Sequence, residues 1–118
     1  MFLDEIVNLS YFDQFNHVIV SDTTIRLPKS VTRITFSDNF DESVENYLPD
    51  TVTHITFGLL FDRPIHTMPK AIVYVAFGEI FCQPIDCVPD SIKFIWLHID
   101  YSLCIPDRLL SKVKLYLG

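Results

Sequence analysis

Residues 48–65 read LPDTVTHITFGLLFDRPI, and this stretch contains every feature that recurs along the chain. It opens with Leu48 and Pro49, and because proline fixes φ and donates no hydrogen bond, it favours a corner. The run that follows, from Val52 to Phe57, is rich in β-branched and aromatic residues and alternates with period two, which predicts a strand. Gly58 then ends the strand and frees the backbone for the next corner.

An apolar triplet with the spacing i, i+3, i+5 recurs along the whole chain. The copies are Phe15/Val18/Val20, Val31/Ile34/Phe36, Val52/Ile55/Phe57, Ile72/Val75/Phe77, Ile92/Ile95/Leu97 and Leu110/Val113/Leu115. The three middle intervals are 21, 20 and 20 residues, and the flanking ones are 16 and 18. Units of this size cannot bury their own apolar side and become stable by stacking, so we expect a mainly β repeat solenoid of five to six coils.

Each coil should contribute one strand to a parallel sheet, because every strand is entered from the same kind of corner. The return segments carry a second apolar pair that should form a phenylalanine ladder: Phe61 with Ile65, Phe81 with Ile85, and Phe40 with Val44. Irregular turns are expected at Pro64 and Pro84. The earlier unit has no such proline, and a short helical turn is expected over 41–46.

The apolar content of 49% in 118 residues supports a single domain. We predict a solenoid over residues 15–118 and a capping helix over residues 1–14, with Phe2, Ile6 and Leu9 on one helical face. The alternative for this segment is the remnant of an F-box. No apolar run is long enough to span a bilayer, and the amino terminus lacks the basic residues of a signal peptide, so we expect a soluble, cytoplasmic protein without a membrane partner.

Charge and side-chain chemistry argue against several classes of function. The net charge of −6 disfavours nucleic acid as a partner, because phosphate binding depends on an excess of Lys and Arg. Three cysteines, an odd number, fit a reducing compartment. Cys87 and Cys104 should stack in adjacent coils, either as two small side chains or as a disulfide.

We expect no catalytic residue, no metal site and no cofactor. The histidines occupy different places within their units, except for His17 and His54, which lie two coils apart. That separation is about 10 Å, too far for one metal ion. No serine or cysteine nucleophile lies at motif spacing from a histidine. The sequence therefore predicts a protein that is not an enzyme.

The unit resembles the FNIP repeat family, a leucine-rich-repeat-like group of social amoebae and of giant viruses that infect amoebae. The resemblance rests on LPDTVTHITFG at 48–58, FDRPI at 61–65 and FCQPI at 81–85, and it covers roughly residues 27–98. The family's asparagine after phenylalanine is replaced by Asp41, Asp62 and Cys82. Aspartate can still accept backbone hydrogen bonds at this place, but cysteine does so poorly.

The resemblance implies an interaction module. Some members carry an F-box that recruits a ubiquitin ligase, and the resemblance then implies host ubiquitin-ligase components or their substrate as partners. In a viral protein the compartment would be the host cytoplasm. A chain without its own F-box could still form the substrate-recognition part of such an adaptor, and a structural homo-oligomer, such as a homodimer, is a further alternative.

The binding face can be predicted from the repeat, because strand residues point alternately to the two sides of a sheet. The outward positions are His17/Ile19, Arg33/Thr35, His54/Thr56, Tyr74/Ala76, Phe94/Trp96 and Lys112/Lys114. None of these is acidic. We predict that a protein partner binds on Tyr74, Phe94, Trp96, His54 and Arg33.

The outward residues could instead serve the fold alone. The aromatic side chains could be covered by the amino-terminal segment, or they could pair across strands to stabilise the sheet. Lys112 and Lys114 fit better as charges that discourage strand addition at an exposed edge than as ligand contacts.

Overall fold

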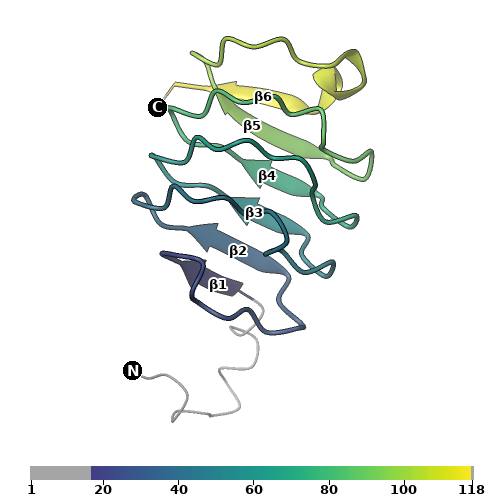
Figure 1. The fold of residues 1–118 in the computed structure, drawn as a ribbon. Helices are drawn as coiled ribbons and strands as arrows, with labels where there is room; N and C mark the ends of the chain where they lie inside the picture. The colour runs from purple at the N-terminus through teal and green to yellow at the C-terminus, as the bar shows by residue number, and fades with distance from the viewer. Residues whose placement is uncertain (1–16, 118) are drawn as a thin grey trace.

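The computed structural model describes residues 17–117, which form a solenoid with six strands in one parallel sheet (Figure 1). The strands are β1 (His17–Val20), β2 (Arg33–Phe36), β3 (His54–Thr56), β4 (Tyr74–Ala76), β5 (Phe94–His98) and β6 (Val113–Tyr116). Their order in the sheet is their order in the sequence. The predicted repeat solenoid with one parallel strand per coil is therefore confirmed. The predicted capping helix over 1–14 and Phe15 lie outside the described residues.

The register of the strands matches the triplets. Ile34 pairs with Ile55, Ile55 with Val75, and Val75 with Ile95, so the central triplet position forms one column through the molecule. All of these side chains are buried. The spacing of the triplets in the sequence thus determines the register of the sheet. A shift of the strand pairing by one residue would turn each apolar side chain to the opposite face.

Each proline corner is a hydrogen-bonded turn with the same geometry. The amides of Val31, Val52, Ile72 and Ile92 donate to the carbonyls of Pro28, Pro49, Pro69 and Pro89, each at 3.2 Å. In two coils a hydroxyl joins the turn to the coil before it, since Thr51 Oγ1 donates to Val31 O at 2.7 Å and Ser91 Oγ donates to Ile72 O at 2.7 Å. The recurring proline therefore sets the direction in which each strand begins.

Gly58 and Gly78 have a different role from the one predicted. No glycine among the described residues has a positive φ, so conformational freedom is not what these positions need. A Cβ on Gly58 would overlap the carbonyl oxygen of Ser37, and one on Gly78 would overlap the carbonyl oxygen of Gly58. Glycine is present because consecutive coils approach closely here.

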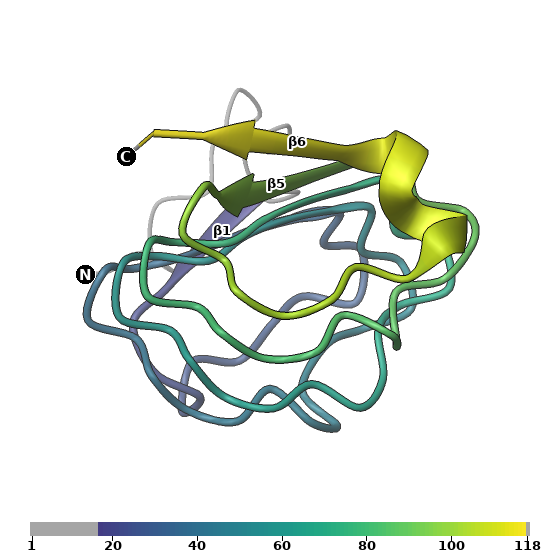
Figure 2. The same cartoon turned by 90° about the horizontal axis from the view of Figure 1, so that it is seen from above.

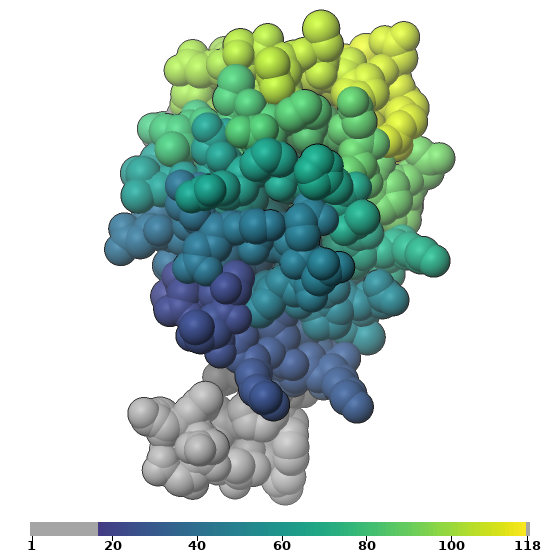
Figure 3. Space-filling view, viewed as in Figure 1, coloured from purple at the N-terminus to yellow at the C-terminus, as the bar shows by residue number. Residues whose placement is uncertain are grey.

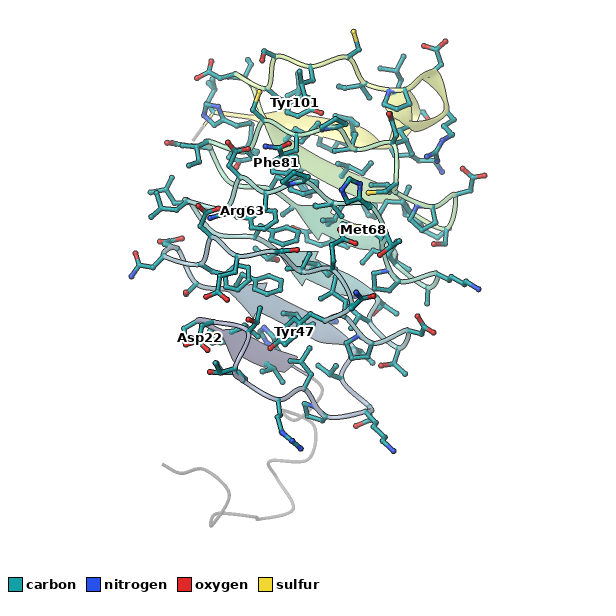
Figure 4. All side chains as sticks on the ribbon, viewed as in Figure 1. Asp22, Tyr47, Arg63, Met68, Phe81 and Tyr101 are labelled. Atoms are coloured by element: carbon teal, nitrogen blue, oxygen red, sulfur yellow. The ribbon has the colours of Figure 1, made fainter. Side chains whose placement is uncertain are left out.

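The predicted phenylalanine ladder is confirmed and is longer than expected. On the return side the ring centroids of Phe40 and Phe61 are 6.0 Å apart, those of Phe61 and Phe81 are 5.9 Å apart, and Tyr101 continues the column 6.2 Å beyond Phe81. Figure 4 shows Phe81 and Tyr101 one above the other in successive coils. A second column, Phe36, Phe57 and Phe77, lies at the strand ends, and its members stack at 4.9 and 5.3 Å. Buried rings from both columns fill the interior.

The return segments are irregular, and Figure 2 shows them opposite the strands in the outline of each coil. The helical turn expected over 41–46 is wrong. Tyr47 N donates to Val44 O at 3.1 Å, and Asn46 takes φ 62°. Asn46 is suited to this left-handed conformation, which ends any helical path, so the chain makes a single turn there.

Aspartates connect the return segments of successive coils. Asp41 Oδ1 accepts from Asp62 N at 3.2 Å, and Asp62 Oδ1 accepts from Cys82 N at 2.9 Å. Cys82 continues the column through a sulfur–oxygen contact of 3.3 Å with Ser102 Oγ. Aspartate thus does accept the backbone bonds that the sequence led us to expect.

The last coil departs from the predicted triplet. A short 3-10 helix, η2 (Asp107–Lys112), places Leu109 in the core and leaves Leu110 52% exposed. Leu115 pairs with Leu97 as predicted, but it is 54% exposed because, in the described chain, no coil lies beyond it. The assignment of Leu110 and Leu115 to the core was therefore wrong.

The three cysteines are free thiols. The disulfide considered for Cys87 and Cys104 is therefore absent. Successive coils stack as continuous bands in the space-filling view (Figure 3), and the described body is elongated, with principal extents of 46 × 27 × 25 Å.

Candidate binding face

The outward face of the sheet carries two columns of side chains. His17, Arg33, His54, Tyr74 and Phe94 lie side by side on β1 to β5. The second column is formed by Ile19, Thr35, Thr56, Ala76, Trp96 and Lys114. The register thus brings together the five residues predicted for partner binding, four in the first column and Trp96 in the second.

The aromatic residues of this face are accessible to different degrees. Phe94 is 46% exposed on β5, whereas Tyr74 and Trp96 are half-buried. Tyr74 lies between Phe94 on one strand and His54 on the other, and its ring stacks on that of His54 with centroids 5.6 Å apart. Part of this aromatic surface therefore stabilises the sheet by cross-strand packing, and Phe94 is the most exposed of the three.

Burial lowers the pKa of His54, and the positive charge of Arg33 lowers it further. Its Nδ1 lies 2.8 Å from Thr53 Oγ1. Both effects on the pKa favour the neutral imidazole at neutral pH. Of the neighbouring pair Arg33 and His54, it is therefore Arg33 that carries the positive charge, and its side chain is exposed.

Carboxylates lie off this face, in the corners and return segments. Asp41 binds Arg63 at 3.1 Å, and Asp90 binds Arg108 at 2.9 Å, so two basic side chains outside the sheet are paired with acids. Figure 4 shows Arg63 at the side of the solenoid. On the face, in contrast, Arg33 and Lys114 are exposed, and no carboxylate occupies either outward column of the described strands. The face is aromatic and basic in a chain with a net charge of −6.

A polar cluster at the ends of the last strands was missed from the sequence. His98 Nε2 lies 4.0 Å from Glu79 Oε1, and its Nδ1 accepts from Asp100 N at 3.1 Å. The ring of Tyr116 meets that of His98 edge to face at 5.3 Å, and its hydroxyl donates to Phe77 O, two coils away. The triplet pattern gave no signal for this cluster, because its members occupy different positions in their units.

An open groove of about 390 Å³ lies on the return side. Its lining comprises Pro64, Ile65, His66, Pro84, Asp86 and Cys87. Burial raises the pKa of the Cys87 thiol to about 11, so the thiolate required of a nucleophile is scarce at neutral pH. In residues 17–117 no three His, Cys, Asp or Glu side chains are grouped as metal ligands would be. The same part of the chain contains no helix with the length and apolar character to cross a membrane.

Comparison with known proteins supports the repeat assignment. The FNIP Repeat family model matches residues 15–60. A solved structure, "The crystal structure of CroV588 a novel circular LRR protein structure", is similar with a TM-score of 0.67 and 30% sequence identity over 75% of this chain. The chain spans only 14% of the length of that giant-virus protein. The search of curated proteins gave no match.

The fold and this face define a class: a parallel, leucine-rich-repeat-like β-solenoid of the kind that usually serves in protein interaction and not in catalysis. Within that class, residues 15–60 match the model of the FNIP repeat family, the family that the repeat residues had indicated.

Proposed function

We propose that this chain binds a protein partner on the outward face of its parallel sheet, with Phe94, Tyr74 and Trp96 as the central contacts and Arg33 and His54 at their flank. The observation that carries the proposal is the exposed ring of Phe94, next to two half-buried aromatic residues, on described strands whose two outward columns contain no carboxylate. Clustered aromatic residues are typical anchors of protein interfaces, and each can contribute about 2 kcal/mol or more when a partner buries it.

The partner chemistry that this face favours is acidic and apolar. Arg33 lies on β2 and Lys114 on β6, with the aromatic residues on the strands between them. Strands in a sheet are about 4.8 Å apart, so the two cations are separated by about 19 Å across the sheet. An extended segment with apolar side chains and acidic ends would complement this arrangement.

The finer proposals rest on the resemblance. The first is that the chain recognises host ubiquitin-ligase components or their substrate. The second is that the protein resides in the cytoplasm, and the three free thiols support it because they suit a reducing compartment. Identification of the captured protein would test the first of these.

The test is a pull-down from amoebal lysate followed by titration of the purified captured protein. We expect a Tyr74→Ser, Phe94→Ser, Trp96→Ser variant to lose capture and to bind the purified partner at least tenfold more weakly, a loss of about 1.4 kcal/mol. A matched control replaces three exposed apolar residues of the corners, Leu59, Leu60 and Ile80, with serine. Capture should survive in this control, and circular dichroism must show both variants folded. Equal capture by the two variants would refute the proposal.

A further inference from the structure

The first three strands of the binding face carry a row of side chains that can hold positive charge. His17, Arg33 and His54 are register partners on β1, β2 and β3, so they lie side by side at the spacing of neighbouring strands, about 4.8 Å. His17 and Arg33 are exposed, and His54 is half-buried. We call these three residues the His–Arg–His row. Neither outward column of the described strands contains a carboxylate that could neutralise it.

Both imidazole rings of the row are held in place by their neighbours. His17 Nε2 lies 2.9 Å from Thr35 Oγ1, so the ring on β1 reaches toward β2. His54 Nδ1 lies 2.8 Å from Thr53 Oγ1, and its ring stacks on that of Tyr74. These contacts engage one nitrogen of each ring. The other nitrogen, Nδ1 of His17 and Nε2 of His54, has no hydrogen-bond partner in the described part of the chain and is available to a ligand.

Arg33 is the charged centre of the row, and no carboxylate of the described strands and loops forms an ion pair with it. Arg63 and Arg108, in contrast, bind Asp41 and Asp90 at 3.1 and 2.9 Å. A guanidinium without an acidic partner presents a planar fork of N–H donors, which matches two oxygens of a carboxylate or a phosphate. The row therefore has the chemistry of an anion site.

We propose that the His–Arg–His row binds a phosphate group carried by a side chain of the protein partner. The row borders the aromatic residues of the same face, so the inference rests on the proposed function and names the chemistry of the same partner. The guanidinium of Arg33 contacts two phosphate oxygens, and the imidazole on either side donates to an oxygen. A carboxylate has two oxygens, which Arg33 alone can occupy. The donors on both sides of Arg33 therefore favour the three free oxygens of a phosphate monoester.

The register also fixes where the phosphate lies relative to the apolar contacts. Arg33 is on β2 and Phe94 is on β5, three strand spacings or about 14 Å away. Four residues of an extended chain cover about 13 Å, and residues four apart direct their side chains to the same side. The partner motif is therefore a phosphorylated residue and an apolar residue four positions apart.

The ionisation of His54 should report occupancy of the row. The groups that face its ring are Arg33 on β2, with His17 beyond it on β1, Tyr74 on β4, and Thr53 in its own coil. In the free chain, burial and the charge of Arg33 lower the pKa of His54. A phosphate beside the ring has the opposite effect and raises this pKa, because a nearby anion favours the imidazolium. An anion bound elsewhere on the molecule would not produce this change.

The first test titrates the 118-residue chain with inorganic phosphate at constant ionic strength and follows the histidine rings by NMR. We expect a saturable change with a dissociation constant on the order of 1–10 mM and a raised pKa of His54. Arg33→Gln should weaken binding by about tenfold or more, because it removes a charge-assisted contact. Arg26→Gln, at an exposed arginine outside both outward columns, is the matched control and should bind as the parent does. Acetate at the same concentrations should bind about fivefold more weakly than phosphate.

Three results of this titration would overturn the proposal. The first is the absence of a saturable change at His54, and the second is equal binding of phosphate by the parent and by Arg33→Gln. The third is equal binding of acetate and phosphate, which would identify the row as a carboxylate site.

The second test separates the phosphate site from the proposed function. Half of the amoebal lysate is treated with a protein phosphatase, which is then inhibited before the pull-down. We expect dephosphorylation and Arg33→Gln each to reduce capture of the partner by about tenfold, and Arg26→Gln to leave capture unchanged. Capture that survives both changes but is lost in the variant with serine at the three aromatic positions would overturn the phosphate site and leave the proposed function standing. Capture that is lost in both but retained in the serine variant would support the phosphate site and refute the aromatic contacts.

Discussion

At the scale of the residue, the packing of successive coils depends on the absence of a Cβ atom at Gly58 and Gly78. At each position the next coil passes so close to the preceding one that a Cβ would meet backbone, which cannot move aside as a flexible side chain can. The glycines were visible in the sequence, but the reason for them was not, because the approach of coils about 20 residues apart is a tertiary feature.

We expect Gly78→Ala to lower the free energy of unfolding by about 2–4 kcal/mol, the range of substitutions that force backbone apart. Urea unfolding followed by circular dichroism measures this change. Ser30→Ala, at an exposed turn residue, should change the same quantity by less than about 0.5 kcal/mol. If the two variants are equally stable, the close approach at Gly78 does not constrain the fold.

At the scale of the element, the aspartate column joins return segments that lack regular secondary structure. Asp62 accepts from Cys82 N at 2.9 Å and from Gln83 Nε2 at 3.1 Å, so it satisfies two donors of the following coil. Hydrogen bonds of this kind replace the ladder that a helix or strand would provide. The sequence correctly indicated that aspartate could fill this place.

Removal of this acceptor should destabilise the protein without changing its fold. We expect Asp62→Ala to lower the free energy of unfolding by about 1–2 kcal/mol, and Asp62→Asn by less than half as much, because the amide oxygen still accepts a hydrogen bond. Chemical denaturation provides the measurement. Asp50→Ala, which removes an exposed aspartate of a proline corner, is the matched control and should be nearly neutral. Equal losses for Ala and Asn at position 62 would show that the charge, and not the hydrogen bond, is what matters.

At the scale of the whole molecule, tyrosine hydroxyls form hydrogen bonds that connect one coil to another. The hydroxyls of Tyr47, Tyr101 and Tyr116 donate to the carbonyls of Ile25, Gln83 and Phe77. Burial raises the pKa of all three phenols, that of Tyr101 from 10.0 to about 12. Ionisation removes the proton that each hydroxyl donates.

The solenoid should therefore lose stability in alkali. A raised phenol pKa leaves its contribution intact below pH 10.0, the unfolded value, and the contribution is lost as pH rises through the folded pKa of about 12. We expect Tyr101→Phe to be about 1 kcal/mol less stable at pH 7, and to lose less stability than the parent between about pH 9 and about 11.5. Urea unfolding across this pH range measures both. Parallel pH profiles for the two proteins would mean that Tyr101 ionises equally in the folded and unfolded chains.

The sequence alone determined the strands, their register and the columns that make the candidate binding face. Local sequence was sufficient for these features, because the proline corners and the apolar spacing act within one unit of about 20 residues. The same unit then recurs along the chain, so each coil adopts the same conformation. Tertiary structure decided the rest. It determined that Leu109 and not Leu110 is buried in η2, that Asn46 turns the chain, and that Glu79, His98 and Tyr116 meet at the strand ends. Each of these depends on how neighbouring coils pack, and the packing between coils is not encoded in the spacing of any single unit.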